Sequence, residues 1–258
     1  MKFLYEDADN TGEHRIENYI YEEIKKYGTI CLPLVDSENS LSNMPEIVEK
    51  FEKIGASAVL VGGSSVTDQI ELTHLISTIK SGIKIPVILF PGNITGVSPE
   101  ADAILFSSLL NSENPYFITE AQALGALAIQ KHGIEPLPTG YVIIGEGTTA
   151  WFVGHARGIP FSKTGIAVMY SLAAQYLGMR FLYLEAGSGA AQNVCPEMVS
   201  AVRKHYRGVL IVGGGIRTPQ IAKETAKAGA DIIVVGSMIE NEKNWEDKLS
   251  SVIMAIRK

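Results

Sequence analysis

Residues 181–217 read FLYLEAGSGAAQNVCPEMVSAVRKHYRGVLIVGGGIR and contain two short apolar runs, each of which leads into a glycine-rich segment. The runs at 181–185 and 209–213 have the length and apolar composition of buried strands. Between them, residues 196–206 carry apolar side chains at three- and four-residue spacing, which indicates an amphipathic helix. A strand, a helix and a second strand in this order are typical of repeated βα units and predict a mainly parallel sheet.

The same alternation continues along the rest of the chain. The other predicted strands are 29–35, 57–62, 86–90, 103–107, 139–144 and 232–236. The other predicted helices are 13–27, ahead of the first strand, and 44–54, 67–81, 117–131, 163–178, 218–228 and 245–257. The segment GNITGVSPEAD at 92–102 is too short and too rich in glycine and proline for an ordinary helix. We therefore expect an irregular connection between the third and fourth strands.

Eight strands of near-uniform spacing favour closure of the sheet into a barrel. We predict an α/β fold with one domain over residues 1–258, a modified (β/α)8 TIM barrel that lacks a regular third helix and carries an N-terminal helix at about 13–27. A doubly wound open sheet would give the same alternation. The barrel is favoured because the sequence shows no sign of a second domain.

Composition excludes several classes of protein. Hydrophobic residues make up 46% of the 258 positions and charged residues 19%, which argues against disorder. The net charge of −6, with no basic run longer than a pair, lacks the charge pattern of a nucleic-acid binder. The acidic N-terminus is unlike a signal peptide, and no stretch approaches the ~18 apolar residues of a membrane span, so we expect a cytoplasmic protein. Neither Cys31 and Cys195 nor the five histidines show the spacing of a zinc site.

Glycines follow the last three predicted strands. These strands end in Gly187-Ser188-Gly189, Gly213-Gly214-Gly215 and Gly236-Ser237. In a parallel barrel the C-terminal ends of the strands form the active-site face. Backbone amides in such turns can converge on a phosphate dianion, because glycine lets the chain approach closely and turn sharply. Three such loops in a row predict a phosphate site, although any one of them could serve only to turn a strand into a helix.

Two carboxylates also follow apolar strands. Glu185 ends the run FLYLE, where it could accept hydrogen bonds from substrate hydroxyls and take a proton from one of them, or form a salt bridge to a neighbouring strand. Tyr183 lies two residues earlier and so points to the same side of the strand. Asp36, after the first strand, is a candidate ligand for Mg2+ bound partly through substrate phosphates, unless it caps a helix or lies in a surface loop. Ser64, at the adjacent strand end, could contribute a hydroxyl.

These motifs resemble those of a known family. The strings YSLAAQYLGMRFLYLEAGSGA at 170–190 and VGGGIRTPQIA at 212–222 are similar to those of the geranylgeranylglyceryl phosphate synthases of archaeal ether-lipid synthesis and the bacterial heptaprenylglyceryl phosphate synthases. The resemblance extends from about residue 29 to 238, and IGEGTTA at 144–150 looks like the larger group of archaeal members. That family is a (β/α)8 barrel without a regular third helix, in agreement with the break at 92–102.

The resemblance implies a prenyltransferase that moves a geranylgeranyl group from its diphosphate to the C3 hydroxyl of sn-glycerol 1-phosphate and releases diphosphate with the assistance of Mg2+. Asp36 and Ser64 would serve the magnesium and the diphosphate, while Glu185 would orient or deprotonate the hydroxyl, with Tyr183 as the second catalytic candidate. Glycerol 1-phosphate would be held by the last three strand ends: Tyr183, Leu184, Glu185, Ala186, Gly187, Ser188, Gly189, Gly214, Gly215, Gly236 and Ser237.

Three positions depart from the family pattern. Asn39 stands where a basic residue usually follows the first strand, Trp151 replaces glycine in GTTAWFVGHA, and Ser237 replaces asparagine. The first departure removes a charge contact to a phosphate. Two alternatives stay open: another phosphate-binding barrel enzyme of isomerase or aldolase type, because such a phosphate site occurs with many chemistries, and a non-catalytic relative that binds lipid phosphate, which the loss of the basic residue at Asn39 suggests.

A geranylgeranyl tail needs a long apolar groove, and the irregular third connection leaves a gap in the helical ring for it. We expect this groove to run past the fourth strand, with Phe117 as the residue that limits tail length and Tyr116 as the second candidate. Both could instead be packing residues. Together with Trp151 and Phe152 they are also candidate anchors of a homo-oligomer.

Overall fold

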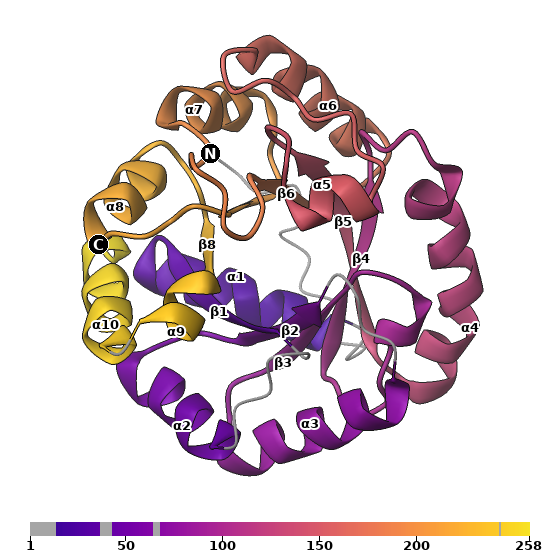
Figure 1. Cartoon of the computed structure of the whole chain (residues 1–258), viewed down its shortest axis with the longest axis vertical. Helices are drawn as coiled ribbons and strands as arrows, with labels where there is room; N and C mark the ends of the chain where they lie inside the picture. Colours follow the sequence, from indigo (N-terminus) through magenta and orange to yellow (C-terminus); the bar gives the residue numbers. More distant parts are fainter. Residues whose placement is uncertain (1–13, 37–42, 64–67, 243) are drawn as a thin grey trace.

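The computed structural model of the chain describes residues 14–36, 43–63, 68–242 and 244–258. Eight parallel strands form a closed barrel in sequence order, and β8 completes the ring by pairing with β1 (Figure 1). All eight predicted strands and the barrel itself are therefore confirmed. The strands are β1 (Ile30–Asp36), β2 (Val59–Gly63), β3 (Val87–Pro91), β4 (Ala103–Leu109), β5 (Glu135–Ile143), β6 (Phe181–Glu185), β7 (Val209–Gly213) and β8 (Ile232–Val235).

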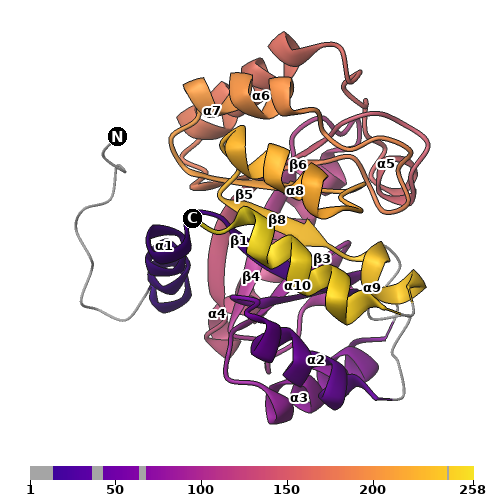
Figure 2. The same cartoon turned by 90° about the vertical axis from the view of Figure 1, so that its left-hand side faces the viewer.

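Helices surround the strands as a ring (Figure 1). They are α2 (Met44–Ile54), α3 (Gln69–Gly82), α4 (Ala121–His132), α6 (Thr164–Tyr176), α7 (Pro196–His205), α8 (Pro219–Lys227) and α10 (Trp245–Ile256). The short helices α5 (Thr149–Val153) and α9 (Ser237–Asn241) lie at one end of the barrel, and α1 (Arg15–Tyr27) lies at the other (Figure 2). The sequence does not predict α5 and α9, because five residues are too few to show a helical period. Among the described residues, no helix combines the length and apolar character needed to cross a bilayer.

The connection between β3 and β4 contains only the short 3₁₀ helix η2 (Ile94–Gly96), which confirms the predicted break in the helical ring. The predicted helix at 117–131 begins as a π-helix, η3 (Tyr116–Glu120), which continues into α4. Strand β5 begins at Glu135, earlier than the predicted start at 139. The prediction is late because Pro136 and Pro138 are unusual within a strand and obscure its pattern. Its neighbour β6 pairs with it only from Thr139 onward.

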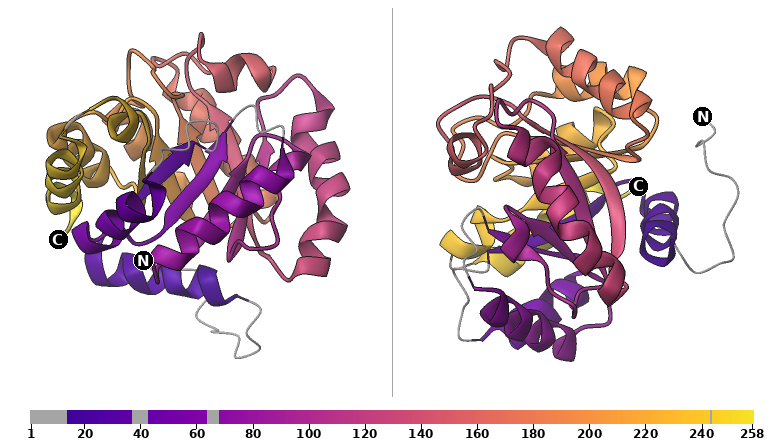
Figure 3. Two further views of the ribbon diagram at one scale, coloured as in Figure 1. Left: turned by 60° about the horizontal axis from the view of Figure 1, so that its bottom comes forward. Right: turned by 90° about the vertical axis from the view of Figure 1, so that its right-hand side faces the viewer.

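The core has two parts, one on each side of the sheet. Inside the barrel, alternate strand residues such as Leu32, Leu60 and Ile211 pack together, while the other face of the strands packs against the ring helices. Helix α1 lies across one end of the barrel (Figures 2 and 3). It packs its apolar side against the interior cluster through Ile16, Ile20 and Ile24. That end is the N-terminal end of the strands, since α1 contacts the first residue of β5, so the opposite end is the one left for a site.

Candidate active site

A cavity opens at the C-terminal ends of the strands. Part of its wall is polar and is formed by Asp36, Glu185, Ser188 and Ser237. Another part is apolar and comes from η2, β4, η3 and α4, with the residues Ile94, Val97, Ile104, Phe106, Leu109, Phe117, Gly125 and Ile129. The cavity therefore extends from the polar strand ends to the break in the helical ring between β3 and β4, where no regular helix is present.

Glu185 is the last residue of β6 and is only 7% exposed. The Tyr141 hydroxyl donates a hydrogen bond of 2.7 Å to its Oε2 atom. No cation among the described residues forms a salt bridge with Glu185, so the alternative of a structural ion pair is not supported. Burial raises the pKa of the carboxyl to about 6, and the Tyr141 hydrogen bond opposes this rise. The group is thus ionised at neutral pH and basic enough to accept a proton.

Tyr183 lies one layer deeper in the barrel than Glu185. Its ring is fully buried, with centroids 5.2 Å from Phe90 and 5.5 Å from Tyr141. Its hydroxyl has no hydrogen-bond partner within the described part of the chain. A Cβ at Gly213 would lie 2.3 Å from this hydroxyl oxygen, so glycine leaves the room it needs. Burial, and then the charge of Glu185, raise the pKa of Tyr183 well above its usual value, so the hydroxyl stays neutral. Tyr183 does not itself line the cavity.

The glycine-rich loops after β6 and β7 lie directly against each other. Gly187 has a φ of +95° and Gly214 a φ of +78°, in the left-handed region that favours glycine. A Cβ at Gly214 would lie 2.5 Å from the backbone nitrogen of Gly187, so no larger residue fits at this contact. Gly189 and Gly215 also have positive φ and follow in the same two loops. The two loops therefore form one compact stretch of backbone at the ends of β6 and β7.

The other predicted residues of the phosphate site differ in where they point. Gly236 and Ser237, after β8, both line the cavity. A Cβ at Gly236 would meet its nearest neighbour only at 3.6 Å, so space here is open. Ser188 is exposed and lines the cavity, whereas the side chains of Leu184 and Ala186 are buried in the core between strands and helices. These last two residues can therefore contribute only their main chain.

Asp36 ends β1 and lines the cavity. It is in register with Gly62 on β2, which is in register with Phe90 on β3, so these three residues lie at one level of the barrel. Ser64, the other predicted metal ligand, and Asn39 lie outside the described residues. The structure thus places one of the two predicted ligands at the cavity.

Phe117 and Tyr116 lie in the π-helix η3. Phe117 lines the cavity, whereas Tyr116 packs edge-on against it with the ring centroids 5.1 Å apart. The His155 ring stacks on Phe117 at 6.2 Å, and His155 is the one non-glycine residue of the described chain with a positive φ, +47°. Neighbours from two segments therefore hold the Phe117 ring at the wall of the cavity.

Sequence reasoning misses the contribution of the segment that contains Tyr141 and α5. Thr149, Ala150 and Val153 of α5 line the cavity, as does Tyr141. The signal for Tyr141 is its place in β5, where a tyrosine that faces the barrel interior brings a hydroxyl into an otherwise apolar layer. For α5 the signal is the family-like string IGEGTTA at 144–150, whose last two residues, Thr149 and Ala150, line the cavity. Within it, Trp151 is partly buried, although Phe152 is 73% exposed.

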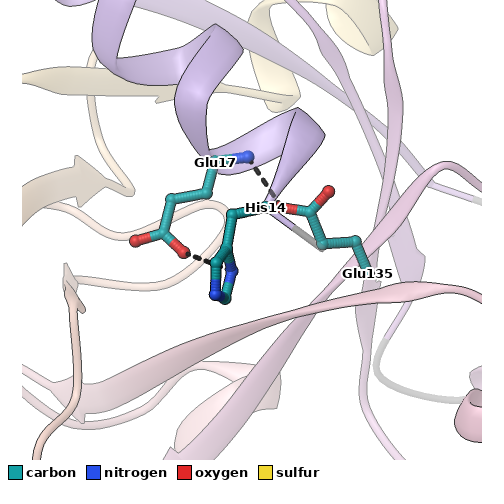
Figure 4. A group of neighbouring side chains, drawn as sticks. All are labelled: His14, Glu17 and Glu135. Carbon is teal, nitrogen blue, oxygen red and sulfur yellow. Dashed lines mark hydrogen bonds and ion pairs between the residues drawn. The ribbon is translucent and has the colours of Figure 1, made fainter. Parts of the chain in front are cut away.

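A second polar group lies at the opposite end of the barrel. His14, Glu17 and Glu135 come together where α1 meets β5 (Figure 4), an arrangement that could hold a metal ion. Both carboxylates already have protein partners, however. Glu135 accepts hydrogen bonds from the backbone N–H groups of Ile16 (2.6 Å) and Glu17 (2.8 Å). Arg180 Nε lies 2.7 Å from Glu17 Oε1. We therefore interpret this group as a clamp that fixes α1 on the barrel.

The sequence matches the model of a family described as the PcrB family over residues 23–256. The chain belongs to the PcrB family. A geranylgeranylglyceryl phosphate synthase from Nitrosopumilus maritimus is 57% identical over 246 residues, which cover 95% of this chain and 98% of that protein. The enzyme of the same name from Cenarchaeum symbiosum is 57% identical over 242 residues, which cover 93% and 98%. The family resemblance drawn from the two glycine-rich motifs is confirmed.

Solved structures agree with this assignment to the PcrB family. (S)-3-O-geranylgeranylglyceryl phosphate synthase from Thermoplasma acidophilum, in complex with substrate sn-glycerol-1-phosphate, has a TM-score of 0.89 and 36% identity, with coverage of 94% of this chain and 98% of that chain. Thiamine phosphate pyrophosphorylase from Pyrococcus furiosus, at 13% identity and a TM-score of 0.59, shares the fold alone; the alignment covers 88% of this chain and 95% of that one.

Proposed function

We propose that this PcrB family member is a prenyltransferase that moves a geranylgeranyl group from its diphosphate to the C3 hydroxyl of sn-glycerol 1-phosphate in ether-lipid biosynthesis. The observation that carries the proposal is the position of Glu185. A buried carboxylate with a pKa of about 6 lines a cavity whose wall also includes Ser188 of the loop after β6 and Gly236 and Ser237 after β8, with apolar residues on another part. The names of the relatives, and the substrate in the Thermoplasma acidophilum complex, support the choice of substrates.

Glycerol 1-phosphate would lie over the ends of β6, β7 and β8. Its phosphate would accept hydrogen bonds from backbone amides of the loops at 187–189 and 214–215 and from the turn at 236–237. Leu184 and Ala186 would support this arrangement through their main chain, since their side chains are buried in the core. The glycerol hydroxyls would then reach Glu185 on the wall of the same cavity.

In the transfer step, the C3 oxygen of glycerol 1-phosphate forms a bond to C1 of the prenyl group as the bond between C1 and the diphosphate oxygen breaks. Glu185 accepts the hydroxyl proton, and diphosphate leaves with the electron pair of the broken bond. Tyr141 holds Oε2 of Glu185, so Oε1 is left for the substrate hydroxyl. Tyr183 stays the second catalytic candidate, because its neutral hydroxyl has no hydrogen-bond partner among the described residues, although its ring lies one layer below the cavity wall.

The proposed reaction uses Mg2+. The donor set at the cavity fits this ion, because Asp36 supplies a carboxylate and Mg2+ is commonly bound by one or two carboxylates together with substrate phosphates. Asp36 would hold the ion, with Ser64 as the second proposed ligand. When bound, the ion neutralises the charge that develops on the departing diphosphate.

The apolar part of the cavity would hold the prenyl tail. Phe117 is placed to stop the tail, and Tyr116, which packs behind it, is the second candidate. An isomerase or aldolase for small polar substrates has no use for such a wall, which favours the prenyltransferase. A non-catalytic lipid-phosphate binder would use the wall but would not need a buried carboxylate with a raised pKa.

We also propose a homo-oligomer, a single-domain organisation and a cytoplasmic location. Exposed apolar side chains support self-association: Phe152 on α5 is 73% exposed, and Leu127 on α4 and Tyr176 on α6 are 76% and 79% exposed. Large apolar side chains of this kind are common anchors of protein interfaces. Light scattering at micromolar concentration should therefore give a mass above that of a monomer.

The proposed activity is tested by incubating the purified protein with labelled sn-glycerol 1-phosphate and prenyl diphosphates of different lengths, with and without Mg2+. We expect a prenylated glycerol phosphate with the geranylgeranyl donor and Mg2+, and little product when the metal is chelated. Absence of product with every donor, under conditions where a geranylgeranylglyceryl phosphate synthase from a relative is active, would reject the proposal.

A further inference from the structure

The side chain of Thr148 lies against the glycine-rich loop after β6. A Cβ at Gly187 would lie 2.4 Å from Thr148 Oγ1, 2.5 Å from its Cβ and 2.6 Å from its Cγ2. All three distances are far below van der Waals contact. The threonine side chain therefore occupies the space that any residue with a Cβ would need at position 187.

Gly187 is held from a second direction by the loop after β7. A Cβ at Gly214 would lie 2.5 Å from the backbone nitrogen of Gly187, so the two main chains are in close contact there. The Ala186 N–H group, one residue earlier, donates to the Gly213 carbonyl at 3.1 Å. Gly187 is thus enclosed between Thr148 and Gly214.

Thr148 is itself fixed by the helix that it begins. Its Oγ1 accepts a hydrogen bond from the Trp151 backbone nitrogen at 3.4 Å, and its carbonyl accepts one from Phe152 at 3.0 Å. The same segment is tied to β6, because the Ile144 N–H group donates to the Glu185 carbonyl at 2.8 Å. Thr148 is therefore fixed directly by its hydrogen bonds within α5. The segment that leads to it is fixed at Ile144 by β6, the strand that carries Glu185.

We propose that Thr148 is a positioning residue for sn-glycerol 1-phosphate: by packing against Gly187 it sets the direction of the amide that binds the phosphate. This role rests on the proposed function and adds to it a residue outside the glycine-rich motifs. Because Thr148 acts through Gly187, its loss should weaken glycerol phosphate binding. The maximal rate should be kept, since Glu185 and its partner Tyr141 are unchanged.

The first test compares Thr148→Ala with Thr148→Val. In Thr148→Ala, we expect the Kd for sn-glycerol 1-phosphate, measured by calorimetry, and the KM to rise roughly fivefold to tenfold, with kcat within about twofold of wild type. Thr148→Val keeps the shape that packs against Gly187 and should restore most of the lost affinity. A valine variant as weak as the alanine variant would show that the hydroxyl, and not the packing, matters, and would overturn the proposed contact.

Thr73→Ala is the matched control. The Thr73 hydroxyl also bonds within a helix, donating to the Gln69 carbonyl at 2.8 Å, but it lies on α3, away from the glycine-rich loops. Its Kd for glycerol 1-phosphate should equal that of wild type. Melting temperatures of all variants separate an effect on the loop from a general loss of stability.

The second test places the missing Cβ at position 187. Gly187→Ala should weaken glycerol phosphate binding by more than about 50-fold, and adding Thr148→Gly to the same chain should recover at least about fivefold, because it removes all three clashing atoms. Gly178→Ala is the control for backbone strain, since Gly178 has a φ of +79° and a Cβ there would have no atom within 4 Å. A double variant no better than Gly187→Ala would contradict the contact.

The results also separate this role from the proposed function. Wild-type protein that binds glycerol 1-phosphate and transfers the prenyl group, beside a Thr148→Ala variant with an unchanged Kd, would overturn the positioning role alone. Wild-type protein that neither binds glycerol 1-phosphate nor forms product would overturn the proposed function and the positioning role with it.

Discussion

Two buried glutamates at opposite ends of the barrel differ in their partners. Glu17, with its side chain 4% exposed, receives Arg180 Nε at 2.7 and 2.9 Å on its two oxygens. Glu185, 7% exposed, receives one hydroxyl, from Tyr141. A contacting cation offsets the cost of burying a carboxylate, whereas a neutral donor offsets it only in part, so the pKa of Glu185 is raised to about 6. Both carboxylates are buried, so what differs between them is the partner: a guanidinium for Glu17 and a neutral hydroxyl for Glu185.

The largest expected effect is the loss of turnover when Glu185, the carboxylate that has no cationic partner, is replaced. Glu185→Gln keeps the size of the side chain but cannot accept the hydroxyl proton, so kcat should fall by roughly 10²- to 10⁴-fold. The melting temperature should stay the same or rise, because a buried charge has been taken away. Product formation under saturating substrates, together with circular dichroism, measures both. Turnover near that of wild type would remove Glu185 as the base.

Replacing Arg180, the cation that pairs with Glu17 at the N-terminal end of the barrel, should instead lower the stability of the fold. Arg180→Ala leaves Glu17 buried without its arginine, although the Tyr21 hydroxyl at 3.2 Å and His14 Nδ1 at 3.6 Å remain beside it. The free energy of unfolding in urea should fall by about 3–5 kcal/mol. The activity of the molecules that stay folded should change little. Replacing both members, as Glu17→Leu with Arg180→Met, should recover most of the stability because no unpaired charge remains. A loss below about 1 kcal/mol in Arg180→Ala would show that the ion pair contributes little.

A change in the apolar wall should affect neither carboxylate. Phe117→Ala shortens the side chain at the cavity wall, so donors longer than geranylgeranyl diphosphate should be accepted while the Kd for glycerol 1-phosphate stays unchanged. Tyr116→Ala tests the second candidate and should change the donor profile less, because Tyr116 packs against Phe117 and does not line the cavity. Competition between donors of different length measures the preference. An unaltered donor profile in folded Phe117→Ala protein would exclude Phe117 as the limit on tail length.

The smallest expected effect concerns the pH dependence of the reaction. Glu185 must be ionised to accept a proton, so kcat/KM should fall as the pH drops through a value near 6. The Tyr141 hydrogen bond lowers the pKa of Glu185, against the larger effect of burial. Tyr141→Phe should therefore raise this pKa and move the acid limb of the profile to higher pH. A limb that moves to lower pH would contradict the assigned direction.

Local patterns in the sequence are enough to predict most of the fold. Each strand is visible as a short apolar run, and each long helix as apolar residues at three- and four-residue spacing. The glycine and proline content of 92–102 predicts the absence of a regular helix between β3 and β4. The start of β5 is placed too late because Pro136 and Pro138 resemble a loop. The short helices α5 and α9 are missed because they have no period.

The order of residues along the chain sets which of them stand at the ends of the strands: Glu185, Asp36 and the glycines of the last three loops. What each of them contacts depends on how the strands close into the barrel. Tyr141 reaches Glu185 across 44 positions of the chain, and Glu135 holds Ile16 across 119. Thr148 meets Gly187 because β5 and β6 are neighbours in the closed barrel. Closure brings distant segments within contact distance, and the pKa of a buried carboxylate depends on such contacts rather than on its neighbours in sequence.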